Sequence, residues 1–167
     1  MIKKELNRPS GKDIYLTIAL EEENNIVSAA WSGFLTIEQV KAGYENLLLV
    51  IKEVRSDKIL VNHSKVSGPW QSANEWFQSS WNHRAVEAGL TTMAVVMSSD
   101  FFAQLSLQGF LRTVKGVYDI ALFNDESAAR QWLIGQAAHS KTKPEEAHCR
   151  RLTKIQSGSG DQSATGA

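Results

Sequence analysis

The order of strand-like and helix-like segments along this 167-residue chain predicts an α/β protein. Two stretches of alternating apolar residues, 14–20 and 26–33, are joined by a short polar turn and predict an antiparallel hairpin. Three further apolar runs, 59–61, 92–97 and 117–123, alternate with helical patterns. Strands that alternate with helices favour right-handed crossovers and parallel pairing. We therefore predict a two- or three-layer sandwich of order β-β-α-β-α-β-α-β-α, with a mostly parallel five-stranded sheet, an N-terminal antiparallel hairpin and four main helices.

The helices are predicted from their caps and from apolar residues at helical spacing. Thr36 and Gln39 form a capping box, and an apolar stripe follows them as far as Val54. A second box at 72–75 precedes the stripe of the next helix, which contains Ala73, Trp76, Phe77, Trp81, Ala85 and Ala88. Ser98, Ser99 and Asp100 supply caps for a third helix, from about Phe101 to about Val114. Asn124 and Asp125 do so for a fourth.

Composition indicates one globular domain. Residues 13–139 carry the pattern, residues 1–12 are predicted to be an arm, and residues 140–167 to be a tail that is first charged and then flexible. The 18 basic and 18 acidic residues cancel, which argues against nucleic acid as a partner. The single cysteine, Cys149, fits a reducing compartment. We expect no signal peptide and no membrane span, and therefore a cytoplasmic protein.

Polar residues follow the predicted parallel strands, and ligands gather beyond the carboxyl ends of such strands. This predicts a ligand-binding or regulatory rim formed by Asn62, His63, Ser64, Ser67, Trp70, Ser98 and Asp100. Helix N-termini point to the same rim and favour an anionic group there. The simpler interpretation, which we prefer, is that Ser98, Asp100, Asn124 and Asp125 only cap helices.

The aromatic residues allow two interpretations. Trp76, Phe77, Trp81 and Phe102 are candidates for an apolar pocket or an interface, because large aromatic side chains anchor interfaces. Packing in the core is the simpler alternative. The four histidines have no metal-ligand spacing, and no glycine-rich phosphate loop occurs, so neither a metal nor a cofactor is predicted.

The chain resembles the SpoIIAA-like group of bacterial domains, which is related to the STAS and Sec14 families. The resemblance covers roughly residues 13–138. It rests on Trp31-Ser32-Gly33-Phe34 at the end of the hairpin, the KILVN strand with its tryptophan-rich helix, and the final segment LFNDESAARQWL. It implies a STAS-like fold. In anti-sigma-factor antagonists of that fold an Asp-x-Ser motif ends the corresponding strand and a phosphorylated serine follows; here the residues are Asn62-His63-Ser64 and then Val66-Ser67-Gly68.

Two functions follow as expectations. The first is a non-enzymatic regulatory or protein-interaction module, with a protein partner or a second copy as its ligand and an exposed apolar patch around the second and third helices. The alternative is a Sec14-like carrier of a lipid or small hydrophobic ligand, with a cavity lined by Trp70, Phe77, Phe101, Phe102 and Phe110. A hydrolase is not favoured, because His63 and Ser64 are adjacent in the sequence and no G-x-S-x-G elbow is present. An enzyme that uses His63, Ser64 and Asp100 would require these side chains to come within hydrogen-bond reach.

Overall fold

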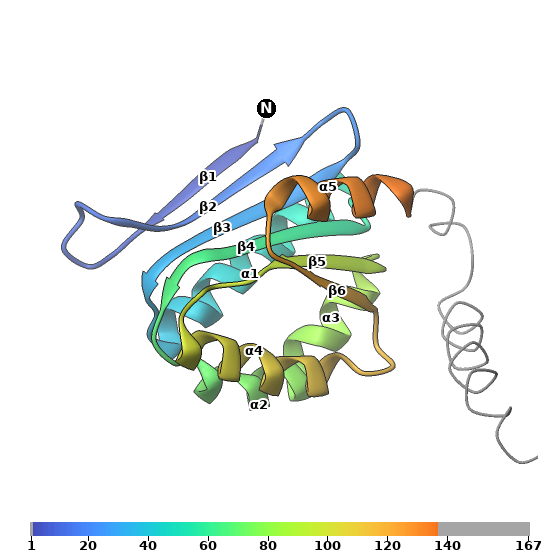
Figure 1. Cartoon of the computed structure of the whole chain (residues 1–167). Coiled ribbons are helices and arrows are strands. Elements are labelled where there is room, and N and C mark those ends of the chain that lie inside the picture. Colours follow the sequence, from blue (N-terminus) through green and yellow to red (C-terminus); the bar gives the residue numbers. More distant parts are fainter. Residues whose placement is uncertain (1, 137–167) are drawn as a thin grey trace, which may run out of the picture.

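The structure is a computed structural model that describes residues 2–136. A six-stranded sheet in the order β1-β2-β3-β4-β5-β6 forms its centre (Figure 1). The pairs β1–β2 and β2–β3 are antiparallel, and the pairs from β3 to β6 are parallel. This confirms the predicted α/β class, with an antiparallel N-terminal part and a parallel remainder. The predicted tail, 140–167, lies outside the described residues.

The N-terminal part of the sheet holds the first difference from the prediction. β2 (Ile14–Glu21) and β3 (Ile26–Phe34) form the predicted hairpin. β1 (Lys3–Asn7) lies within the predicted arm and pairs along β2, so the sheet has six strands rather than five. The sequence KKELN does not show the apolar alternation of a half-buried strand. β1 is an edge strand, and its conformation is fixed by its hydrogen bonds to β2.

The first helix, α1 (Ile37–Val54), begins as predicted. The Thr36 Oγ1 accepts a hydrogen bond from the Gln39 amide at 3.2 Å, and the Gln39 side chain accepts one from the Thr36 amide at 3.1 Å. The helix ends at Arg55, whose backbone is left-handed. Its buried side chains include Val40, Tyr44, Leu47, Leu48 and Ile51, so the predicted stripe is the face that packs on the sheet.

Gly43 lies where α1 comes closest to the sheet, and we expect Gly43→Ala to destabilise the protein. An added Cβ would lie 2.7 Å from the Leu16 Cδ2 and would overlap the buried ring of Trp31. Alanine gains about 1 kcal/mol over glycine in a helix, but overpacking costs about 1–3 kcal/mol. The cost of the clash should exceed the gain in helix propensity. Urea denaturation should therefore show that the free energy of unfolding falls by about 1 kcal/mol. Ala42→Gly, at the exposed neighbouring position, measures helix propensity alone. A Gly43→Ala variant more stable than wild type would contradict this packing.

β4 (Lys58–Ser67) is longer than predicted. The apolar run at 59–61 is confirmed as strand, but pairing with β3 continues to the contact between Phe34 and Ser67. The register shifts opposite Ala30 and Ser32, and this irregularity interrupts the alternation beyond Asn62. The predicted loop at 62–68 is therefore mostly strand.

The second predicted helix is irregular. It consists of a 3-10 turn (Gln71–Ala73), α2 (Asn74–Trp76), a π-helical turn (Phe77–Trp81) and α3 (Asn82–Glu87). The predicted capping box at 72–75 is wrong, because no side chain caps the start of this segment. Its position is set by Trp70 instead. That ring is buried, and its backbone amide donates to the Ser106 Oγ at 2.9 Å.

The remaining elements follow the prediction closely. β5 (Thr92–Val96), α4 (Phe101–Val114), β6 (Asp119–Phe123) and α5 (Glu126–Gly135) complete the described chain. Asp100 caps α4 and Asp125 caps α5. Helices α1–α4 cover one face of the sheet with the larger core, and α5 covers part of the other face over a smaller one (Figure 1). The carboxyl ends of β3, β4 and β5 consequently meet at the edge where α4 begins.

Candidate functional site

The structure brings together one part of the predicted rim. The Ser98 Oγ donates a hydrogen bond to the Val66 carbonyl at 2.6 Å, which fastens the loop after β5 to the end of β4. The Asp100 Oδ1 accepts from the Gly68 amide at 3.1 Å and from the Ala103 amide at 2.9 Å. Ser98 and Asp100 thus join two strand ends to the start of α4. Asp100 caps the helix, as its simpler interpretation predicts, whereas the Ser98 Oγ accepts from the Asp100 amide and does not cap α4. Ser67 lies exposed beside them.

The other predicted rim residues lie along β4 rather than beyond its end. The Asn62 Nδ2 donates to the Glu126 Oε2 of α5 at 2.9 Å, and its Oδ1 accepts from the Ser64 amide at the same distance. His63 lies on the opposite face of the strand, against Trp70. Ser64 is exposed. Asn62, His63 and Ser64 therefore belong to three different environments and form no common site with Asp100.

His63 is buried on the helix-covered face of the sheet. Its ring meets that of Trp70 edge to face, with centroids 5.4 Å apart, and its side chain makes no hydrogen bond within residues 2–136. Burial lowers the pKa of His63 from its usual 6.5 to about 4, because a charged imidazole loses its hydration there. The ring is neutral at neutral pH and has no carboxylate to orient it. His63 is therefore a side chain of the core.

The predicted apolar pocket is divided between core and surface. Phe77 and Trp81 are fully buried. Trp76 is half-buried, with the Lys41 Nζ 6.0 Å and the Arg84 Cζ 5.9 Å from its ring centroid. The residues predicted to line a lipid cavity divide in the same way. The rings of Trp70, Phe77 and Phe110 pack against one another with centroids 4.8–6.4 Å apart. Phe101 and Phe102 point outwards.

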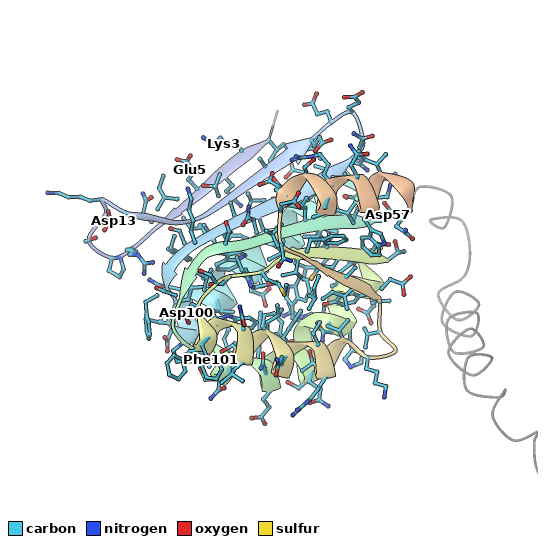
Figure 2. The ribbon with its side chains drawn as sticks, viewed as in Figure 1. Lys3, Glu5, Asp13, Asp57, Asp100 and Phe101 are labelled. Carbon is cyan, nitrogen blue, oxygen red and sulfur yellow. The ribbon has the colours of Figure 1, made fainter. Side chains whose placement is uncertain are left out.

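Four of the seven large apolar side chains that are exposed in residues 2–136 lie at or near the start of α4. Phe34, Phe101 and Phe102 are 57%, 65% and 57% exposed, and Leu105 follows Phe101 by one helical turn. We call Phe34, Phe101, Phe102 and Leu105 the aromatic face. Figure 2 shows Asp100 and Phe101 at the edge where the chain enters α4. The sequence analysis expected an exposed apolar patch around the second and third helices. It named Phe102 as a pocket or interface candidate and Phe101 as lining a cavity, and it named neither Phe34 nor Leu105.

Within the described part of the chain, no group of three or more metal-binding side chains comes together. The same residues contain no helix long and apolar enough to cross a membrane.

The described elements define a six-stranded α/β sandwich with an antiparallel hairpin leading into a parallel sheet. The chain is similar to a solved structure from Shewanella loihica PV-4, an uncharacterised protein from the DUF3478 family with a SpoIIAA-like fold. The identity is 14%, the TM-score is 0.40, and the match covers 71% of this chain and 91% of that chain. Nothing about the function of this chain follows from this similarity. No protein-family model and no curated protein matches the chain.

Proposed function

We propose that this chain is a non-enzymatic, STAS-like regulatory module that acts by binding a protein through its aromatic face. The observation that carries the proposal is the exposure of three phenylalanine rings at one edge of the sheet. At about 200 Å² per ring, they present roughly 350 Å² of apolar surface. The largest apolar patch on a folded domain is typically about 300–600 Å² and is often functional, whereas single exposed apolar side chains are ordinary.

The polar residues of the rim support a binding role rather than a chemical one. Ser98 and Asp100 hold backbone groups at the strand ends, and Asn62 holds α5. His63 is buried against Trp70 and neutral at neutral pH, while Ser64 is exposed. A general base must reach the proton that it removes, and a nucleophile needs such a base beside it. These side chains instead stabilise the edge from which the aromatic face projects.

The test uses the full-length chain purified from its source organism, as wild type, as the double variant F101S/F102S and as L49S. Leu49 is 59% exposed on α1 and provides the matched control. We expect native mass spectrometry to show a protein partner on wild type and L49S. The double variant should lose it by about tenfold or more, because an interface aromatic contributes about 2 kcal/mol. Retention of the partner by F101S/F102S, or a bound mass of lipid size in place of a protein, would overturn the proposal.

A further inference from the structure

The geometry points to a second copy of this chain as the occupant of the aromatic face, in a two-fold symmetric dimer where Arg8 of each copy pairs with Asp100 of the other. This inference rests on the proposed function, because it uses the same face and names the partner. It is carried by the continuity of the face and by the two opposite charges along it.

The face is continuous from Arg8 to Phe102. The Arg8 Nη1 donates to the Phe34 carbonyl at 2.7 Å. The Phe34 ring lies directly over Gly68, where an added Cβ would come within 2.6 Å of it. The Gly68 amide in turn donates to Asp100, which begins α4. Contacts through Phe34 and Gly68 thus link the cation of Arg8 to the anion of Asp100.

Neither charge has a counter-ion within residues 2–136. The guanidinium of Arg8 donates to the carbonyls of Ser32 and Phe34 and, at 3.5 Å, to the Gln39 side chain, all uncharged acceptors. The Asp100 Oδ1 accepts from two backbone amides, while its Oδ2 makes no hydrogen bond to another described residue. Both side chains are half-buried and retain some exposure. Each can therefore take a charged partner without giving up its present contacts.

Two-fold symmetry makes this arrangement self-complementary. In such an interface, residue i of one copy faces residue j of the other, and j faces i. A patch with one cation and one anion therefore forms two ion pairs at once, and its rings meet rings. Because the net charge of the chain is zero, two copies do not repel each other through their overall charge. The roughly 350 Å² of ring surface is less than half of the ~800 Å² that each partner buries in a standard stable interface, so we expect a micromolar dissociation constant.

The first experiment is sedimentation velocity of the full-length recombinant chain across the micromolar range. Wild type and L49S should shift from monomer to dimer as the concentration rises, and F101S/F102S should remain monomeric with an unchanged urea midpoint. Surface substitutions of this kind leave the free energy of unfolding almost unchanged. A wild-type chain that is monomeric throughout, or a double variant that dimerises as well as wild type, would overturn the inference.

A charge exchange tests the pairing itself. R8E alone places two carboxylates against each other, and D100R alone places two guanidinium groups together, so each variant should self-associate about tenfold more weakly than wild type. A mixture of the two should form a heterodimer, because both of its pairs then join a carboxylate of the R8E copy to a guanidinium of the D100R copy. Circular dichroism confirms that each variant is folded, since Arg8 and Asp100 also make internal hydrogen bonds. Failure of the folded variants to associate on mixing would contradict the assigned pairs.

The two proposals fail differently. If the pure chain is monomeric, but the chain binds a different protein and loses it only when Phe101 and Phe102 are substituted, the inferred dimer is wrong and the proposed binding function stands. If the aromatic substitutions alter neither self-association nor any bound protein, both proposals are wrong.

Discussion

Replacing Trp81 with alanine is expected to lower the free energy of unfolding by about 4 kcal/mol, in the range for buried aromatic residues truncated to alanine. The ring is fully buried and meets Tyr44 and Phe77 edge to face, with centroids 4.9 and 6.0 Å away. Its Nε1 donates to the Tyr44 carbonyl at 2.8 Å. Trp81 therefore joins the π-helical turn to α1 by packing and by a hydrogen bond. Its removal leaves a cavity between the two.

The conservative substitution Trp81→Phe separates these contributions. Phenylalanine keeps most of the ring but loses the indole N–H, so the loss should be about 1–2 kcal/mol. Urea denaturation monitored by far-UV circular dichroism gives both values. Equal losses for the two variants would show that the hydrogen bond dominates. A Trp81→Ala loss below about 1 kcal/mol would contradict the packing of this segment against α1.

Local signals in the sequence were sufficient for the regular elements. The capping box at Thr36 and Gln39 depends only on side chains three residues apart, and the structure has both of its hydrogen bonds. The caps at Asp100 and Asp125 depend on equally local contacts. The strand at 59–61 is continuously apolar because both faces of β4 are covered, and this run was the signal that predicted it.

Non-local contacts decided what the sequence did not show. The strand character of β1 comes from pairing along β2, which the mostly polar sequence of residues 3–7 does not indicate. The irregular start of the tryptophan-rich segment comes from the anchoring of Trp70 by Ser106, 36 residues away in the sequence. In both places tertiary structure overrides a local pattern.

In the candidate site, too, local features could be predicted from the sequence and non-local contacts could not. Capping by Asp100 could be predicted from the sequence, because a polar residue before an apolar stripe starts a helix. The proximity of Phe34 to Phe101 and Phe102 was not readable, because it requires the end of β3 to lie over Gly68 and the start of α4 to meet that glycine. One available signal was the imperfect stripe of α4, where adjacent phenylalanines at its first two positions cannot both face the core.

Lowering the pH from about 7.5 to about 5 is expected to destabilise the protein by about 2 kcal/mol through His63 alone. Burial holds the pKa of His63 at about 4, below the 6.5 of an unperturbed histidine. The unfolded chain therefore takes up a proton at this residue at a higher pH than the folded chain does. The stabilisation is complete above about pH 6.5 and declines as the pH falls towards 4, at up to about 1.4 kcal/mol per pH unit.

His63→Leu should abolish this part of the pH dependence, because leucine fills the buried position without a titrating group. His83→Gln removes an exposed imidazole from α3 and provides the control, which should behave as wild type. Urea denaturation at a series of pH values between about 5 and 7.5 measures the effect above the range in which the carboxylates titrate. Equal losses of stability in His63→Leu and wild type would show that His63 is solvated in the folded protein, against its placement beside Trp70.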